Sequence, residues 1–230
     1  MHIPDNYLGP QTYVAAYAVA APFWVIASRL VSRTLRMRQV PLLALGAAFS
    51  FVIMMFNVPA PGGTTGHAVG SVLIAVLLGP WPAVIAVSIA LAVQALLFGD
   101  GGITAFGANC LTMAVIMPFV GYGVYRLIAA GSSATSWRRW FGAAVGGYLG
   151  LLVAAAVTGF LLGIQPMLAH DAAGRPLYQP FPLAVAVPAM VLEHLLVFGW
   201  VEAIVTGLVV AYLQRTDVTL LSPQATEAAK

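Results

Sequence analysis

The chain has 230 residues, of which 61% are hydrophobic and only 7% are charged. A soluble domain carries about 25% charged residues, so this composition, with a mean hydropathy of +0.94, excludes an ordinary soluble protein. The formal charge of +3 does not indicate a nucleic-acid partner, because the basic residues lie between apolar runs, where they orient a chain in a bilayer. The sequence predicts an integral membrane protein.

Apolar stretches along the chain predict about seven transmembrane helices and an all-α fold. Most approach the length that crosses a hydrocarbon core of about 30 Å, and the stretch 67–98 is broken by Gly79-Pro80-Trp81-Pro82 into two shorter helices. The predicted ranges are 11–32, 40–57, 67–79, 81–98, 104–128, 140–165 and 183–213. Because 67–79 is short for a full span, we expect this helix to begin below the membrane surface, inside the protein.

The domain organisation and orientation follow from the same pattern. We expect residues 1–214 to form a single transmembrane domain with an inserted N-terminal segment, and 215–230 to form a polar cytoplasmic tail. The positive-inside rule places the N-terminus outside and the C-terminus in the cytoplasm, because nine of the ten basic residues are then cytoplasmic and only Arg175 is outside. The expected location is the inner (cytoplasmic) membrane, with several passes.

The first two residues, Met1-His2, can form a metal chelate. The free amine, the His2 amide nitrogen and the His2 Nδ1 close a five-membered and a six-membered ring on one ion and lie nearly in a plane. The orientation above brings the loop 58–66, and therefore His67, to the same face, so its imidazole is a candidate for the fourth corner. A square of four nitrogens suits Ni(II) or Cu(II) and disfavours Zn(II). The alternative is an ordinary frayed terminus.

Polar residues of two glycine-rich outer loops are candidates for supporting these ligands through hydrogen bonds. We expect Thr64 or Thr65 to cap a helix that begins near His67. An equally plausible interpretation is that all of these are ordinary polar groups of loops and helix ends. The candidates are Asn57, Thr64, Thr65, Asp100 and Asn109, with Gln94 near them.

Other polar residues in the apolar runs carry weaker signals. Glu193, His194 and Glu202 lie in the last predicted helix, where ionisable groups are functional candidates, although we expect Glu193 and His194 to serve in helix–helix hydrogen bonding. Ala44 and Ala48 form a small-xxx-small pair suited to close contact with another subunit. No P-loop, HExxH or GxSxG motif is present, which argues against an ATPase, a zinc protease and a serine hydrolase.

Three motifs carry a family resemblance. They are Met-His-Ile-Pro-Asp-x-Tyr-Leu at 1–8, Phe-Asn-Val-Pro-x-Pro-Gly-Gly-Thr-Thr-Gly-His at 56–67, and Leu-Phe-Gly-Asp-Gly-Gly-Ile-Thr-Ala-x-Gly-Ala-Asn at 97–109. The chain resembles the substrate-specific component of energy-coupling factor transporters for nickel and cobalt. The resemblance implies seven helices and metal ligation by Met1, His2 and His67.

The resemblance also implies partners. They are a membrane coupling subunit, two cytosolic ATPase subunits and a small accessory membrane protein. The expected function is therefore high-affinity capture of Ni(II), or of Co(II), by a subunit that is not an enzyme and needs no cofactor. Ile3-Pro4 and the square of nitrogens favour nickel.

Two alternatives come from other classes of protein. The first is a stand-alone secondary transporter or channel for a small polar solute or metal ion, which predicts polar residues near the middle of discontinuous helices. The second is an intramembrane enzyme, for which the sequence offers no nucleophile–base pair.

Overall fold

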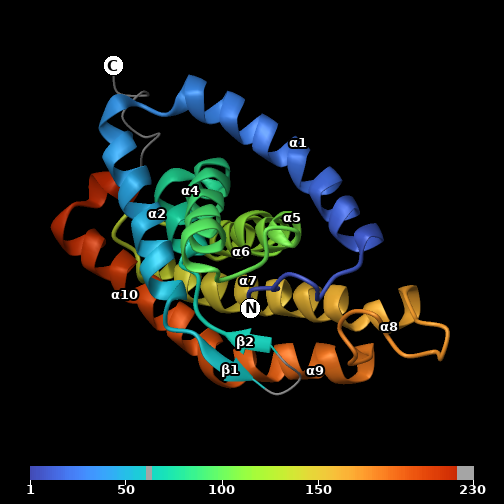
Figure 1. The fold of residues 1–230 in the computed structure, drawn as a ribbon. Coiled ribbons are helices and arrows are strands. Elements are labelled where there is room, and N and C mark those ends of the chain that lie inside the picture. Colours follow the sequence, from blue (N-terminus) through green and yellow to red (C-terminus); the bar gives the residue numbers. More distant parts are fainter. Residues whose placement is uncertain (61–63, 222–230) are drawn as a thin grey trace.

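The computed structural model describes residues 1–60 and 64–221, which form helices around a buried centre and one small hairpin (Figure 1). The N-terminus lies within the bundle (Figure 1). The elements are α1 (Pro10–Thr34), α2 (Val40–Met54), β1 (Val58–Ala60), β2 (Thr64–Gly66), α3 (Ser71–Leu78), α4 (Pro80–Val93), α5 (Phe106–Asn109), α6 (Met117–Ala129), α7 (Trp137–Gly163), α8 (Gln165–Leu168), α9 (Leu183–Glu193) and α10 (Gly199–Thr216).

Several α-helices continue directly into π-helical or 3₁₀ segments, so the transmembrane spans are longer than the α-helical segments alone. The connecting segments are the 3₁₀ turn Met37–Gln39 and the π-helical segments Gln94–Phe98, Cys110–Ile116 and His194–Phe198. With them, six helices of the described chain are long and apolar enough to cross a membrane. The all-α membrane fold is therefore confirmed.

The seventh predicted helix is present as α3, which has only eight residues and cannot span the bilayer. All residues from Ser71 to Leu77 are buried, and α3 contacts α2, α4, α6, α7 and α10. The expected break lies at Gly79, where a φ of 96° ends α3, and α4 begins with Pro80. A proline at the first helical position costs no hydrogen bond, so the sequence fixes this turn locally.

Close helix packing around α3 depends on small residues. A Cβ on Gly146 of α7 would lie 2.4 Å from the Gly121 carbonyl oxygen of α6, so these two backbones touch directly. Small residues permit such contacts between membrane helices, where van der Waals packing drives association. The result is a tight core around α3.

The start of the predicted helix 67–79 is wrong by four residues. His67 lies in an extended segment, and α3 begins only at Ser71, after Gly70 with a φ of 75°. Thr65 belongs to β2, which pairs with β1 in an antiparallel hairpin, and the residue before α3 is Gly70, so Thr65 does not cap this helix. Backbone pairing in the hairpin and the left-handed Gly70 outcompete the capping that the sequence suggested.

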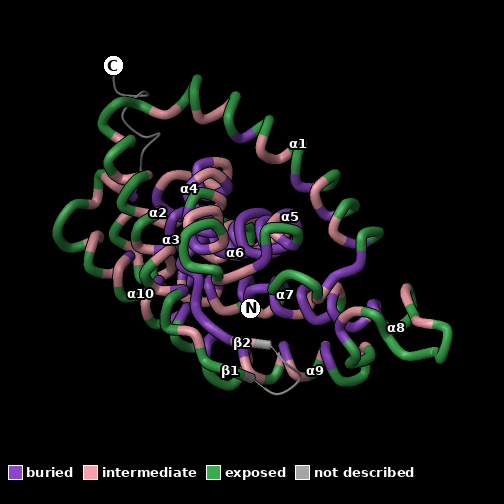
Figure 2. Tube along the Cα trace, viewed as in Figure 1, coloured by how far each residue is buried: buried purple, intermediate pink, exposed green. Residues whose placement is uncertain are grey.

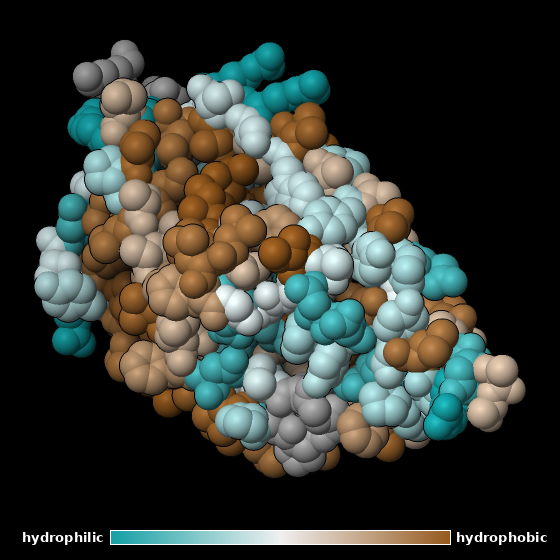
Figure 3. All heavy atoms as spheres, in the orientation of Figure 1, coloured by the Kyte–Doolittle hydropathy of each residue, from teal (hydrophilic) through white to brown (hydrophobic). Residues whose placement is uncertain are grey.

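The outer surface matches a bilayer environment. Figure 3 shows a broad apolar area over the left and upper part of this face, with hydrophilic atoms along its edges and across the lower centre and right. Large aliphatic and aromatic side chains are exposed on most long helices. Ala44 and Ala48 are also exposed on α2. Such a surface is stable only against lipid or protein partners.

Only the start of the predicted tail 215–230 is described, and residues 222–230 lie outside the described residues. Helix α10 continues to Thr216, and the 3₁₀ turn Val218–Leu221 packs against α3 and α10. Leu221 is buried in the main apolar cluster.

Candidate metal centre

The N-terminal segment runs into the interior of the bundle (Figure 2). Met1 and Ile3 are fully buried and His2 is 5% exposed. Segment 1–9 leads from this centre to the start of α1 at the protein surface. The N-terminus is thus part of the core.

The Asn109 side chain bonds to both main-chain polar groups of Ile3 in the N-terminal segment, as the backbone of a neighbouring β-strand would. Its Oδ1 accepts a hydrogen bond from the Ile3 amide at 2.9 Å, and its Nδ2 donates to the Ile3 carbonyl at 3.1 Å. The Gly102 amide donates to the same carbonyl at 2.8 Å. Both main-chain polar groups of buried Ile3 are therefore satisfied, as burial requires.

Asp5 fastens the segment to the loop after Gly102. Its carboxylate accepts hydrogen bonds from the amides of Ile103 and Thr104 at 3.2 and 2.8 Å, and from the Thr104 hydroxyl. These donors lower the pKa of Asp5. The sequence analysis did not identify this contact, because it joins residues 98 and 99 positions apart.

The Met1 amine lies against β2, where it donates to the Thr65 carbonyl oxygen and, at 3.1 Å, to the Thr65 hydroxyl. Burial lowers the pKa of this amine from 8.0 to about 5. The amine is therefore neutral at pH 7, and its lone pair is available to a metal ion.

His2 is oriented by Gln94. The Gln94 Nε2 donates to the Phe51 carbonyl at 3.4 Å, which turns Gln94 Oε1 toward His2 Nε2 at 3.2 Å. An amide oxygen only accepts, so this contact is a hydrogen bond when His2 Nε2 carries the proton, and Nδ1 then has an open lone pair. Burial also lowers the pKa of His2 to about 3, so the imidazole is neutral, and its approach to Asp100 Oδ1 at 3.3 Å is not an ion pair at pH 7.

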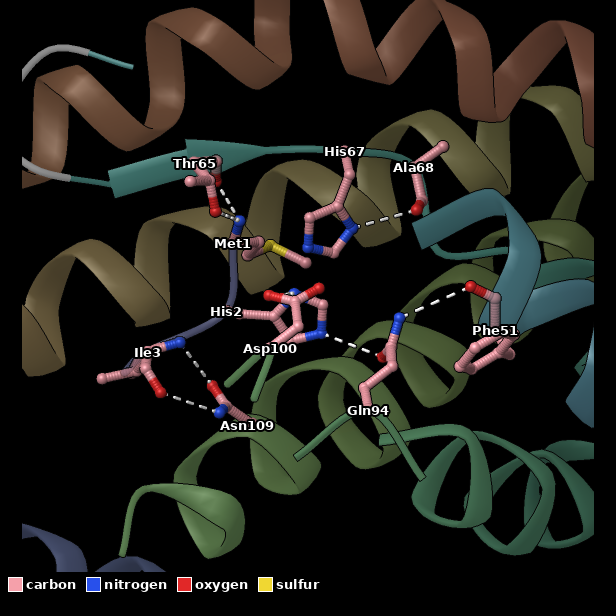
Figure 4. Close-up of polar contacts among 10 residues, drawn as sticks. All are labelled: Met1, His2, Ile3, Phe51, Thr65, His67, Ala68, Gln94, Asp100 and Asn109. Carbon is pink, nitrogen blue, oxygen red and sulfur yellow. Dashed lines mark hydrogen bonds and ion pairs between the residues drawn. The ribbon is translucent and has the colours of Figure 1, made fainter. Parts of the chain in front are cut away.

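His67 has the complementary arrangement. Its Nδ1 donates to the Ala68 carbonyl at 3.0 Å, and its buried Nε2 has no hydrogen-bond partner among the described residues. Burial lowers the pKa of His67 well below its ordinary value. The rings of His2 and His67 are stacked, with centroids 4.5 Å apart, and Figure 4 shows them one above the other beside Met1.

The candidate donor atoms are two imidazole nitrogens, of His2 and His67, together with the Met1 amine and the His2 amide nitrogen. Within 1–60 and 64–221, no group of three His, Cys, Asp or Glu side chains is placed to hold a metal ion. The His2 amide N–H has no hydrogen-bond acceptor within the same residues.

The other candidates from the sequence are placed as follows. Thr65, Asp100 and Asn109 lie in contact with the first three residues. Asn57 has a buried Oδ1 without a hydrogen-bond partner among the described residues. The side chain of Thr64 lies outside the described residues.

Glu202 supports His67 from the last helix. Its carboxylate accepts hydrogen bonds from the Val69 amide at 2.8 Å and from the Gly70 amide at 3.0 Å.

The expectation that His194 forms a helix–helix hydrogen bond is wrong, because its Nδ1 donates to the Met190 carbonyl one turn earlier in the same helical segment. Glu193 also makes no such bond, because both of its carboxylate oxygens are buried without a described partner.

Gln165 was missed by the sequence analysis because it ends an apolar run without any motif. Its Oε1 accepts a hydrogen bond from the Gly9 amide at 2.9 Å, and its Nε2 donates to the Thr12 hydroxyl at 3.0 Å. The residue therefore fixes the point at which the N-terminal segment turns into α1.

These features define a multi-pass helical membrane protein whose own N-terminus forms a buried, nitrogen-rich centre. The family described as "Cobalt uptake substrate-specific transmembrane region" matches residues 2–220, and the chain belongs to this family.

Known relatives agree in sequence and in fold. The chain is 55% identical to the fused nickel transport protein of Rhodobacter capsulatus over 100% of its own length, and 51% identical to a probable fused nickel transport protein of Lactiplantibacillus plantarum over 96%. It spans 66% of the length of each of these relatives. A crystal structure of a truncated transition metal transporter is 51% identical, with a TM-score of 0.89 over 94% of this chain and 99% of that one.

Proposed function

We propose that the chain captures Ni(II) with high affinity, as the substrate-binding membrane subunit of an ATP-driven energy-coupling factor uptake transporter. The ligands are the Met1 amine, the His2 amide nitrogen and Nδ1, and the His67 Nε2. The observation that carries the proposal is that both imidazoles present an open lone pair beside a neutral amine, while their other nitrogens are hydrogen-bonded. Such a site is prepared for a cation before the cation arrives.

Nickel is favoured over cobalt for two reasons. A square of four nitrogens suits Ni(II), and two relatives that share more than half of their aligned residues with this chain are named nickel transport proteins. Co(II) is the second candidate substrate, since the family description names cobalt uptake.

The chain needs partners to transport the ion. The expected partners are a membrane coupling subunit, two cytosolic ATPase subunits and a small accessory membrane protein. The exposed pair Ala44 and Ala48 on α2 offers close backbone contact to another membrane helix. With the N-terminus outside, the basic residues at the end of α1 and in the turn that follows it, Arg33, Arg36 and Arg38, face the cytosolic ATPases.

The test is the metal content of purified protein that has a free, untagged N-terminus. One tightly bound Ni(II) per chain is expected, and an N-terminally acetylated preparation should bind none at the same concentration because its amine is blocked. A native protein that takes up no Ni(II) contradicts the proposal. In cells, uptake should require the coupling and ATPase subunits, and uptake by the chain alone would instead indicate a secondary transporter.

A further inference from the structure

His2 lies between two hydrogen-bond acceptors and has one proton to give. Gln94 Oε1 is 3.2 Å from His2 Nε2, and Asp100 Oδ1 is 3.3 Å from His2 Nδ1. A neutral imidazole carries a single N–H. Only one of the two acceptors can therefore receive a hydrogen bond, and the choice decides which ring nitrogen is left open.

If acceptor strength alone decided, the proton of His2 would lie on Nδ1, which faces Asp100. A carboxylate is the stronger acceptor, because hydrogen bonds to charged groups are about twice as strong as neutral ones. A proton on Nδ1 would block the nitrogen that closes the six-membered chelate ring. Asp100 therefore works against the arrangement that a metal ion needs.

The structure nevertheless favours Gln94. The contact of Nε2 with Gln94 is a hydrogen bond, whereas Nδ1 has no hydrogen-bond partner in the described chain despite its proximity to Asp100. Gln94 is fully buried, and the Asp100 side chain is 26% exposed, so water can solvate the carboxylate. The amide oxygen has no such alternative.

Gln94 itself is held in place. Its Nε2 donates to the Phe51 carbonyl at the end of α2, so a flip of the amide would turn a donor toward His2 and an acceptor toward another acceptor. The residue begins the π-helical segment Gln94–Phe98 that ends the span of α4, and such irregular turns are frequent at functional sites. Figure 4 shows the chain of contacts from Phe51 through Gln94 to His2.

We propose that Gln94 is a positioning residue that keeps the proton of His2 on Nε2 against the pull of Asp100, so that Nδ1 stays open toward the metal. This inference rests on the proposed function for its purpose, although the tautomer itself exists without metal. The hydrogen bond of one ring nitrogen sets the state of the other.

The first experiment measures the tautomer directly. In metal-free protein labelled with ¹⁵N-histidine, only four histidines contribute signals, and His2 is assigned by its loss in His2→Ala. We expect a protonated Nε2 and an unprotonated Nδ1 in the native protein, and a proton on Nδ1 in Gln94→Leu. A native His2 that carries its proton on Nδ1 overturns the inference without any variant having to fold.

The second experiment measures Ni(II) affinity in a double-mutant cycle. Gln94→Leu should weaken binding about 10–100-fold, as loss of an outer partner of a ligating histidine does, whereas the exposed control Gln11→Leu should not. In an Asp100→Ala background the competing acceptor is gone, so Gln94→Leu should have a clearly smaller effect. Equal losses in both backgrounds overturn the inference. A native protein that binds no Ni(II) would overturn the proposed function, while the metal-free tautomer would still decide the role of Gln94.

Discussion

At the scale of single residues, the site is defined by which nitrogens are free. His2 and His67 each use one ring nitrogen in a hydrogen bond, to Gln94 and to the Ala68 carbonyl, and leave the other open. The Met1 amine is neutral because it is buried. Each donor is thus prepared by a different neighbour, and each can be tested separately.

Replacing His67 with alanine should remove one of four metal ligands. We expect Ni(II) binding to weaken by more than the roughly 10–100-fold that follows loss of an outer partner, while the protein stays folded. Titration calorimetry of the variant measures this. His170→Ala is the matched control, because His170 lies exposed in the loop after α8, and equal affinities for the two variants would mean that His67 is not a ligand.

The pH dependence of Ni(II) binding should have two regimes. The amine pKa is lowered from 8.0 to about 5, so between pH 7 and pH 5 the amine is already neutral and only the His2 amide proton is released on binding. The logarithm of the association constant should then fall by about one for each pH unit. Below about pH 5 the amine becomes protonated as well, and the slope should rise toward two.

The same shift has a consequence for the metal-free protein. An amine with a lowered pKa binds its proton more weakly when it is buried than when it is released, so burial of segment 1–9 should weaken as pH falls from 8 to 5, by about 1.4 kcal/mol for each unit. Hydrogen exchange of this segment over that range measures the effect. If the logarithm of the Ni(II) association constant instead falls by two for each pH unit between pH 7 and pH 6, the amine keeps its ordinary pKa and this interpretation is wrong.

At the scale of elements, the site depends on how separate segments are tied together. Asn109 at the end of α5 and Asp5 join the N-terminal segment to the loop 99–105. Glu202 joins α10 to the extended segment that carries His67. The candidate metal centre is therefore assembled from the N-terminus, the hairpin, and the ends of α4, α5 and α10.

Glu202→Ala should loosen the segment that carries His67. The change leaves the buried amides of Val69 and Gly70 without their acceptor, and each unsatisfied group costs about 1–3 kcal/mol. We expect a lower melting temperature in detergent and weaker Ni(II) binding. Glu202→Gln keeps one acceptor oxygen and should lie between native protein and Glu202→Ala; an alanine variant as stable as native protein would contradict the role of this carboxylate.

At the scale of the whole molecule, the N-terminus is a structural part of the bundle and not an appendage. Met1 belongs to the same apolar cluster as α3 and α4, and its amine meets the hairpin strand β2. The length of the segment from Met1 to α1 is thus fixed by contacts at both of its ends. This makes the spacing of the first residues testable.

Inserting one leucine between Met1 and His2 should separate binding from transport. The longer terminus offers an amine, two amides and an imidazole, which is a complete square of four nitrogens. Ni(II) binding should persist and should no longer depend on His67, whereas uptake in cells that contain the partner subunits should be lost. Normal uptake by this variant, or binding that still needs His67, would contradict the chelate of two residues.

The sequence by itself determined the features that arise from local chemistry. Hydropathy and length gave the long helices, and Gly79 followed by Pro80 gave the break between α3 and α4. The chelating power of Met1-His2 follows from covalent bonds alone, because the two rings form within adjacent residues. None of these features needs knowledge of which segments meet in space.

The tertiary structure alone decided how the donors are prepared. Gln94 and Glu202 act on residues 92 and 133 positions away, and no local pattern encodes such pairs. The hairpin pairing of β1 with β2 and the left-handed Gly70 placed His67 in an extended segment instead of at a helix start. The neutral state of the Met1 amine likewise depends on burial, which only the assembled bundle provides.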